Sequence, residues 1–136
     1  MSDDIWGVNC AAATPVGADG RPDLRLFAGH CQALLKEGAH GLAILGTTGE
    51  ANSFGTTDRM ALVDTALTAG IRGAQLLPGT SACNVAETVA LTRHAVQAGA
   101  KACVLLPPFY YKGVSDDGLY RFYAEVIEGV GDTRLR

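Results

Sequence analysis

Apolar residues along this chain occur in two alternating patterns. Short, mostly apolar runs cover residues 5–13, 41–45, 74–78 and 102–106. Runs in which polar residues do not alternate with apolar ones are typical of strands buried on both faces of a parallel sheet. In the intervals between them, apolar side chains recur every three or four residues, which predicts an amphipathic helix in each interval. The pattern therefore predicts four strand–helix units in the order β-α-β-α-β-α-β-α.

The last three units share an internal repeat. Each begins with a glycine, Gly38, Gly70 or Gly99, that follows a helical segment and precedes an apolar run. The three glycines are about 30 residues apart, and a glycine with positive φ ends a helix at little steric cost. The repeat indicates that one supersecondary unit recurs along the chain.

The predicted helices have apolar stripes and start signals. Asp23 and Ser115 are candidate N-caps, and Asn84 with Glu87 three positions later resembles a capping box. The stripes consist of these positions: Leu24, Phe27, Cys31, Leu34 and Leu35; Met60, Val63 and Leu67; Val85, Val89, Thr92 and Val96; Leu119, Phe122 and Val126.

Four βα units correspond to half of a (β/α)8 TIM barrel, whose usual length is about 250 residues. An open, doubly wound parallel sheet is the alternative. The short, even repeat favours the barrel, as does the lack of a Gly-x-Gly-x-x-Gly motif after the first strand. Four strands leave two sheet edges unpaired, and residues 132–136 resemble the approach to a fifth strand. We therefore expect residues 1–136 to be the amino-terminal half of a barrel and the remainder of the barrel to lie outside this chain.

Composition and charge argue against several classes of binding partner. The 136 residues carry 11 Lys and Arg against 14 Asp and Glu, a formal charge of -3, which argues against nucleic-acid binding. No apolar stretch approaches the roughly 18 residues of a membrane span, and the first residues do not resemble a secretory signal. The four cysteines form no Cys-x-x-Cys pair, and the three histidines show no metal-ligand spacing. We expect a cytoplasmic protein without a metal ion, whose cysteines are small buried apolar residues.

Candidate chemistry lies in loops after the predicted strands, because functional loops of βα proteins follow the carboxyl ends of strands. Residues 46–50, the 46–50 loop, read Gly-Thr-Thr-Gly-Glu. Backbone N–H groups freed by the glycines, together with two hydroxyls, suit a bound carboxylate. A P-loop is excluded because the loop holds no lysine. The alternative is a tight turn whose threonines satisfy nearby backbone groups.

Three further side chains in these loops leave alternatives open. Residues 107–112, the 107–112 loop, place Tyr110 and Tyr111 after two prolines. A phenol there can relay a proton, or it can pack or lie at a subunit contact. Glu50 can act as a base, or it can close a hydrogen-bond network around its own loop. Residues 14–16 and 79–83 form the other two loops; the latter is the 79–83 loop.

Four motifs in order give the chain a resemblance to a known family. They are Ala-Thr-Pro-Val at 13–16, Gly-Thr-Thr-Gly-Glu at 46–50, Gly-Thr at 79–80, and Leu-Pro-Pro-Phe-Tyr-Tyr-Lys at 106–112. Together they resemble the dihydrodipicolinate synthase / N-acetylneuraminate lyase family over essentially the whole chain. The resemblance implies a (β/α)8 barrel and a class I aldolase or lyase that joins a lysine to pyruvate as a Schiff base. It implies no metal or organic cofactor.

The resemblance also assigns roles to residues of this chain. Thr47 would belong to a proton relay and contact the substrate, while Thr48 and Gly49 would bind the pyruvate carboxylate. Tyr110, or Tyr111 if the loop is one residue longer, would be a relay tyrosine lent across a subunit interface. A homo-oligomer, either tetramer or dimer, is therefore expected.

Two family residues fall beyond Arg136. The resemblance implies a Schiff-base lysine on the sixth strand of the barrel and a second relay tyrosine at the end of the fifth. We therefore expect Lys36, Lys101 and Lys112 to form no Schiff base, and these 136 residues alone to be inactive.

The resemblance leaves the second substrate open. Either pyruvate would condense with an aldehyde, or a sugar acid or related 2-oxo acid would be cleaved, and an activity like 4-hydroxy-tetrahydrodipicolinate synthase is the leading expectation. The alternative is a non-catalytic half-barrel that binds a small carboxylate or acts only as an assembly module.

Overall fold

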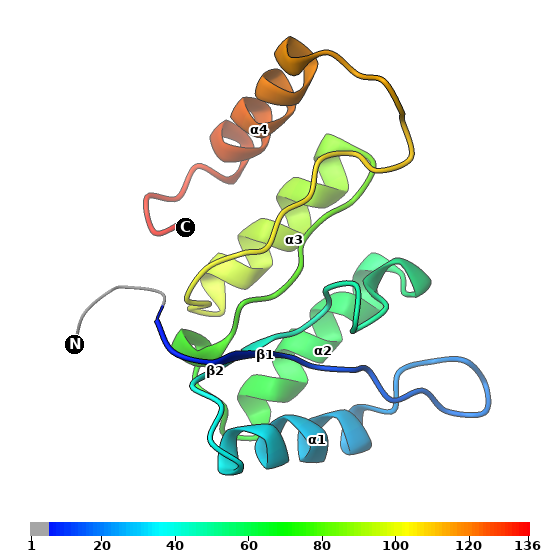
Figure 1. Cartoon of the computed structure of the whole chain (residues 1–136), viewed down its shortest axis with the longest axis vertical. Coiled ribbons are helices and arrows are strands. Elements are labelled where there is room, and N and C mark those ends of the chain that lie inside the picture. The colour runs from blue at the N-terminus through cyan, green and yellow to red at the C-terminus, as the bar shows by residue number, and fades with distance from the viewer. Residues whose placement is uncertain (1–5) are drawn as a thin grey trace.

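The computed structural model describes residues 6–136, in which a short parallel sheet is flanked by helices (Figure 1). In this part of the chain, the strands are β1 (Asn9–Ala11) and β2 (Gly41–Ala43). The α-helices are α1 (Leu24–Lys36), α2 (Thr56–Thr68), α3 (Val85–Gln97) and α4 (Asp116–Val130), and two 3-10 turns are η1 (Ala51–Ser53) and η2 (Gly73–Gln75). All four predicted helices are therefore present.

The predicted helix starts are confirmed by hydrogen bonds. The side chain of Asp23 accepts from the backbone N–H of Leu26 at 2.9 Å, and Asn84 accepts from that of Glu87 at 2.8 Å. At the start of α4, Ser115 accepts from the N–H of Gly118 at 3.2 Å. Each bond satisfies one of the N–H groups that a helix leaves unpaired at its first turn.

The glycines of the repeat are confirmed as helix ends. Gly38, Gly70 and Gly99 have φ values of +109°, +86° and +74° and follow α1, α2 and α3. This left-handed conformation reverses the chain toward the next strand, and glycine adopts it without a Cβ clash.

The sheet is parallel, and its regular part is shorter than predicted. β1 pairs with β2 in the register Asn9↔Gly41, Cys10↔Leu42 and Ala11↔Ala43. The first predicted strand, residues 5–13, begins with one residue, Ile5, that lies outside the described part. The third and fourth predicted strands form only single parallel bridges, Leu42↔Leu76 and Gly79↔Val104.

Local chain geometry explains the shortened third strand. The beginning of the predicted run is the 3-10 turn η2, and Pro78 has no N–H to donate to a ladder. Backbone bonds nevertheless continue across the sheet: Leu77 N donates to Leu42 O at 2.9 Å, and Val104 N donates to Pro78 O at 2.9 Å. The segments thus keep the sequential order β1, β2, third, fourth.

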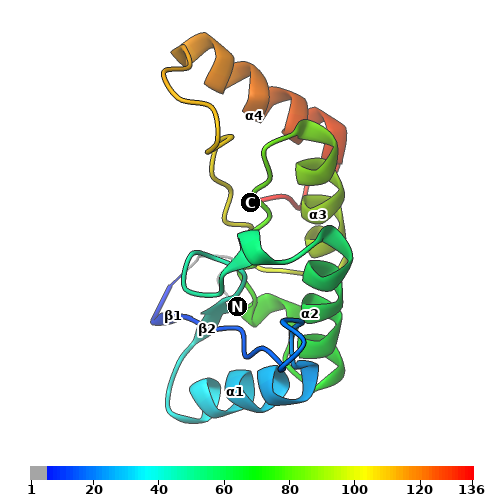
Figure 2. The same ribbon diagram turned by 90° about the vertical axis from the view of Figure 1, so that its right-hand side faces the viewer.

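The helices pack as neighbours in chain order, α1 on α2, α2 on α3 and α3 on α4. Figure 2 shows α1, α2 and α3 on the same side of β1 and β2. A doubly wound sheet distributes its helices over both faces. Sequential strands with helices on one side instead match part of a (β/α)8 barrel.

Two clusters form the core, one around α1, α2 and the strands and one between α3 and α4. The predicted α2 stripe is partly wrong: Val63 is buried, but Met60 and Leu67 are only half-buried, while Leu62 and Ala66 are buried. The stripe shifts because α2 packs against α1 and α3 on its two sides, while its buried residues share a core cluster with Leu42 and Ile44. Leu24 of α1 is also exposed.

The cysteine prediction holds for one residue: Cys31 is buried, the other three are half-buried, and all four are free.

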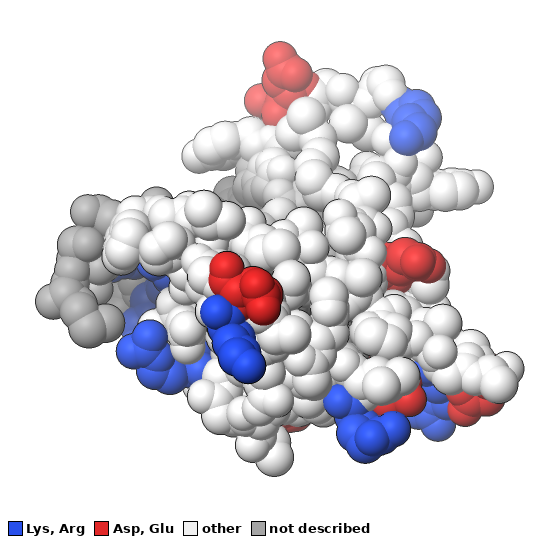
Figure 3. Space-filling view, turned by 60° about the horizontal axis from the view of Figure 1, so that its bottom comes forward, with Lys and Arg blue, Asp and Glu red and all other residues white. Residues whose placement is uncertain are grey.

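Charged side chains of both signs are interspersed on the face in Figure 3, with broad uncharged areas between them. Between residues 6 and 136, no helix is both long enough and apolar enough to span a bilayer.

Candidate functional site

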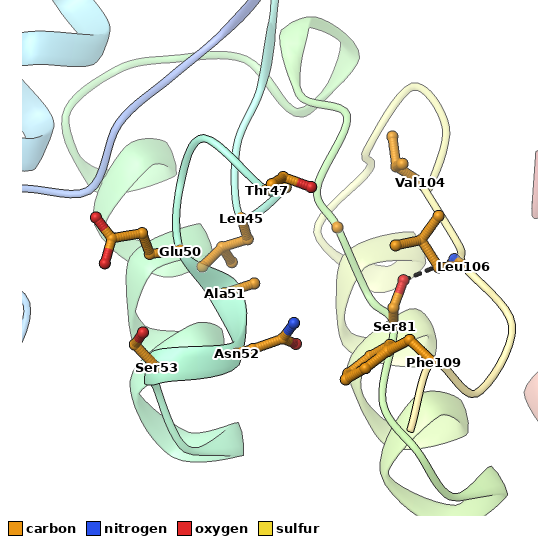
Figure 4. Close-up of a pocket in the computed structure, with 12 residues that line it drawn as sticks. Leu45, Thr47, Glu50, Ala51, Asn52, Ser53, Ser81, Val104, Leu106 and Phe109 are labelled. Carbon is orange, nitrogen blue, oxygen red and sulfur yellow. Dashed lines mark hydrogen bonds between the residues drawn. The ribbon is translucent and has the colours of Figure 1, made fainter. Parts of the chain in front are cut away.

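A cleft of about 220 Å³ opens at the carboxyl end of β2 and of the neighbouring parallel segments. Figure 4 shows the 46–50 loop and η1 on one wall and residues from the 79–83 and 107–112 loops on the other. Its lining residues are Leu45, Gly46, Thr47, Glu50, Ala51, Asn52, Ser53, Gly79, Ser81, Val104, Leu106 and Phe109. Segments far apart in the sequence, and predicted to carry function, therefore meet here.

The 46–50 loop is a tight turn held by its own backbone. Glu50 N donates to Thr47 O at 3.1 Å, and the Thr14 hydroxyl donates to Gly49 O at 2.8 Å. Leu45 and Glu50, at either end of the turn, have φ values of +58° and +51°. Left-handed backbone costs about 1–3 kcal/mol for a residue other than glycine, and such strain is concentrated at functional sites.

Of the predicted substrate-binding residues, Thr47 lines the cleft. Its side chain is exposed, and its hydroxyl points toward the opposite wall (Figure 4). Thr48 is exposed but does not line the cleft. Gly49 is buried where a Cβ would come within 2.9 Å of Leu45 N, so that only glycine fits there. The turn therefore presents one of its two hydroxyls to the cleft.

The structure corrects the interpretation that the Glu50 side chain closes a hydrogen-bond network around its own loop. Within residues 6–136 its carboxylate has no hydrogen-bond partner, and the network around the loop is closed by its backbone N–H instead. In Figure 4 the carboxylate points away from Ser81 and Phe109. The carboxylate thus does not hold its own loop.

The two predicted tyrosines lie outside the cleft lining. Tyr110 is 77% exposed and Tyr111 is 59% exposed, and their rings meet edge to face with centroids 5.5 Å apart. Phe109, the residue before them, enters the cleft instead. Lys112 turns back on the loop, where its Nζ donates to Phe109 O at 2.7 Å.

Arg59 is a residue of this region that sequence reasoning missed. It lies on α2 and is only 5% exposed. One terminal nitrogen donates to Ser81 O at 2.9 Å and the other to Gly79 O at 3.0 Å. Burial lowers the pKa of this guanidinium, while the nearby Glu87 carboxylate acts in the opposite direction. Its position three residues before Leu62, on the buried stripe, is the signal that could have identified it.

Two hydroxyls in the 79–83 loop were also missed. Ser81 Oγ accepts from the backbone N–H of Leu106 at 2.7 Å (Figure 4). Thr80 is 2% exposed and its hydroxyl accepts from that of Thr92 on α3 at 2.9 Å. Both residues fasten this loop to neighbouring elements.

Hydroxyl and amide side chains line the described part of the cleft together with backbone polar groups, and they suit a small polar ligand: Thr47, Asn52, Ser53 and Ser81. No lysine lines it. Lys36 ends α1, and Lys101 pairs through its backbone N–H with Leu76 O, near the amino end of the fourth segment. Among residues 6–136, no three His, Cys, Asp or Glu side chains gather in a way that could hold a metal ion.

Comparison with known proteins identifies a family match. Residues 4–134 match the model of the dihydrodipicolinate synthetase family. The chain is 33% identical to 4-hydroxy-tetrahydrodipicolinate synthase of Rhizobium meliloti over 120 residues, which are 88% of this chain and 40% of that protein. The chain thus spans about 40% of the length of such relatives.

Solved structures show the same match. Dihydrodipicolinate synthase of Agrobacterium tumefaciens superposes with a TM-score of 0.88 at 32% identity, covering 93% of this chain and 44% of that one. YagE of Escherichia coli, named a putative 2-dehydro-3-deoxy-D-gluconate aldolase, is 36% identical over 124 residues, or 91% of this chain and 41% of that protein. Its structure in complex with pyruvate superposes with a TM-score of 0.83 at 34% identity, covering 93% and 42% of the two chains. These are TIM-barrel proteins, so the fold prediction is confirmed: the chain corresponds to about the first four βα units of the barrel.

Proposed function

The chain belongs to the dihydrodipicolinate synthetase family, and from this we propose that residues 1–136 form the amino-terminal half of a pyruvate-dependent aldolase or lyase. The observation that carries the proposal is the cleft between the 46–50 and 107–112 loops. It lies at the carboxyl ends of parallel strands, where barrel enzymes hold their substrates.

The 46–50 loop is proposed to hold the 2-oxo acid. Thr47, whose hydroxyl faces the opposite wall (Figure 4), contacts the substrate and passes a proton. The hydroxyl and N–H of Thr48, with the backbone of Gly49, bind the carboxylate of pyruvate. These two act once the rest of the barrel completes the site around the turn.

The tyrosine of the relay is proposed to serve a neighbouring subunit. Tyr110 and Tyr111 both extend from the 107–112 loop into solvent, and neither lines the cleft of its own chain. A phenol held outside its own site is available to complete that of a second copy. Tyr110 is our first choice because it is the more exposed, with Tyr111 as the alternative, and the active protein is a homo-oligomer.

The reaction itself is proposed to proceed through an imine. A lysine amine adds to the C2 carbonyl of pyruvate and one water leaves, which forms the Schiff base. Loss of a C3 proton then gives an enamine whose carbon bonds to the carbonyl carbon of an aldehyde, while the aldehyde oxygen takes up a proton. Water hydrolyses the product imine and frees the lysine; cleavage is the reverse. Lys36, Lys101 and Lys112 are not that lysine, so the 136 residues alone are inactive.

The leading second substrate is the aldehyde used by a 4-hydroxy-tetrahydrodipicolinate synthase, as in the Rhizobium meliloti relative. A sugar-acid substrate is the second candidate, favoured by the 36% identity to YagE. Two assays of the naturally expressed protein separate them: condensation of pyruvate with the aldehyde, and release of pyruvate from the sugar acid alone.

Trapping with borohydride tests the central step. We would incubate the naturally expressed protein with pyruvate and borohydride, record its intact mass and map the modified peptide. One reduced adduct on a lysine outside these 136 residues is the expected result, with no adduct when pyruvate is left out. An adduct on Lys112 would overturn the assignment of the lysine. No adduct would leave the non-catalytic half-barrel that binds a carboxylate.

A further inference from the structure

Arg59 holds two carbonyl groups that belong to the 79–83 loop. Its side chain leaves α2, is 5% exposed, and forks to Gly79 O and Ser81 O at 3.0 and 2.9 Å. A buried charge is stable only when it is paired or well hydrogen-bonded. The fork therefore fixes the position of the loop relative to α2.

The Gly79 end of the fork touches the 46–50 loop. Gly79 N donates to Ile44 O at 2.8 Å. A Cβ added to Gly79 would lie 2.0 Å from Leu45 O and 3.3 Å from Gly46 N. The backbones are thus in direct contact, so a shift of Gly79 displaces the residues that begin the 46–50 loop.

The Ser81 end of the fork reaches the 107–112 loop. The hydroxyl of Ser81 accepts from the N–H of Leu106 at 2.7 Å (Figure 4). Pro107 and Pro108 follow directly, and because proline fixes φ, an anchor at Leu106 constrains Phe109, which comes directly after the two prolines. Phe109 lines the wall opposite η1.

A nearby carboxylate stabilises the charge of the guanidinium, whose Nε is buried without a hydrogen-bond partner in the described part of the chain. Glu87, at the start of α3, favours the charged form of Arg59. Its carboxylate also accepts from the hydroxyl of Thr56, at the start of α2, at 3.0 Å. Glu87 thus links the start of α3 to the start of α2, the helix that carries Arg59.

We propose that Arg59 is a positioning residue that sets the spacing between the 46–50 and 107–112 loops across the cleft, acting through Gly79 and Ser81. Its catalytic consequence rests on the proposed function, whereas the positioning does not. A lysine cannot replace it, because an ammonium lacks the planar fork that reaches two carbonyls at once.

Hydrogen exchange of the Leu106 amide tests the positioning without any substrate. In the naturally expressed protein we would compare Arg59→Met, which keeps an unbranched apolar stem, with Arg21→Met. Arg21 also pairs with a residue of α2, Asp58, but its own side chain is exposed. It is therefore the matched control. Arg59→Met is expected to accelerate exchange at Leu106 at least 10-fold, with the α1 amides unchanged. Equal acceleration in all elements, or an unchanged Leu106, would overturn the proposal.

Ser81→Ala provides a test that does not depend on how Arg59→Met folds. It removes the link to Leu106 but leaves both carbonyls to Arg59. With pyruvate as the probe, we expect kcat/KM to fall at least 10-fold while the thermal midpoint changes by less than about 2 °C. The variant that combines Arg59→Met and Ser81→Ala should have a kcat/KM no lower than that of the more affected single variant, because both substitutions break the same chain of contacts. Unchanged kinetics in Ser81→Ala, or fully additive losses, would contradict the path.

The two proposals fail in different ways. If the wild-type protein forms no pyruvate adduct, the proposed function fails, and hydrogen exchange at Leu106 still decides the role of Arg59. If the adduct forms and Arg59→Met exchanges like the wild type at Leu106, only the positioning proposal fails.

Discussion

Thr47 is the one hydroxyl of the 46–50 loop that lines the cleft. Its orientation depends on a short turn: Leu45 and Glu50 are both left-handed, and Thr14 anchors Gly49 O from the end of the first strand. A small set of residues thus determines where a single hydroxyl points.

Replacing Thr47 with Val removes that hydroxyl and keeps the shape of the side chain. If it passes a proton in the proposed reaction, kcat should fall by about 100-fold or more, the lower range for positioned acid–base groups. Thr47→Ser should retain most of the rate. Steady-state kinetics with pyruvate would measure both, with Thr57→Val on the exposed side of α2 as the control. A loss of less than threefold in Thr47→Val would exclude the relay.

Two thiols should make the free energy of unfolding depend on pH in the alkaline range. Burial raises the pKa of Cys31 and of Cys103 to about 11, above their ordinary value of 9.0. Between these values the folded protein binds more protons than the unfolded chain, so the free energy of unfolding should fall as pH rises from about 9 to 11. Urea titrations at pH 8 and 10.5 would measure the fall, which should be smaller in Cys103→Ala. An equal fall in the variant would contradict the prediction.

Among the elements, α3 shows how a helix is fastened on two sides. Val96 packs with the α4 residues Phe122, Val126 and Val130. Thr88 and Thr92, on the buried side of α3, are nearly inaccessible and hydrogen-bonded. The bond from Thr92 to Thr80 connects the helix with the 79–83 loop, so it joins an outer element to the region of the cleft.

Thr92→Val should leave the Thr80 hydroxyl without this partner. Loss of a buried hydrogen bond with one group left unsatisfied costs about 1–3 kcal/mol of unfolding free energy. Replacing both threonines with valine should cost less than the two single losses added together. Urea unfolding at constant m-value would test this, with Thr68→Val at the exposed end of α2 as the control. Additive losses would show that the two hydroxyls do not act as a pair.

At the scale of the whole molecule, neighbouring βα units approach each other most closely through glycine. A Cβ at Gly73 would lie 2.3 Å from Ala98 O, and one at Gly79 would lie 2.0 Å from Leu45 O. Backbone atoms cannot move aside as a flexible side chain can. The packing of one unit on the next therefore depends on positions without a side chain.

Gly79→Ala should destabilise the molecule by about 1–3 kcal/mol or more, the usual cost of overpacking. Gly29→Ala is the matched control: a Cβ there meets nothing within 4 Å, and replacing glycine in a helix interior stabilises by up to about 1 kcal/mol. Thermal or urea unfolding should give shifts of opposite sign. A neutral Gly79→Ala would mean that the two segments separate readily.

The sequence by itself determined the features that depend on residues a few positions apart. The N-caps Asp23, Asn84 and Ser115 and the positive-φ glycines of the repeat are of this kind, because a cap bond or a helix end needs only its own turn of chain. Strand–helix alternation followed from the spacing of apolar residues in the same way. The preference for a barrel over a doubly wound sheet followed from the even repeat of about 30 residues and from the lack of a Gly-x-Gly-x-x-Gly motif.

Only the tertiary structure decided which side chains meet. An isolated arginine in a predicted helix is expected to be exposed. Arg59 is nevertheless buried, because its guanidinium reaches two backbone carbonyls of a loop some 20 residues away. The sequence singled out Tyr110 and Tyr111 in the 107–112 loop and passed over Phe109, yet Phe109 lines the cleft while Tyr110 extends into solvent. Contacts of this kind depend on the relative placement of whole units, and no local pattern records that placement.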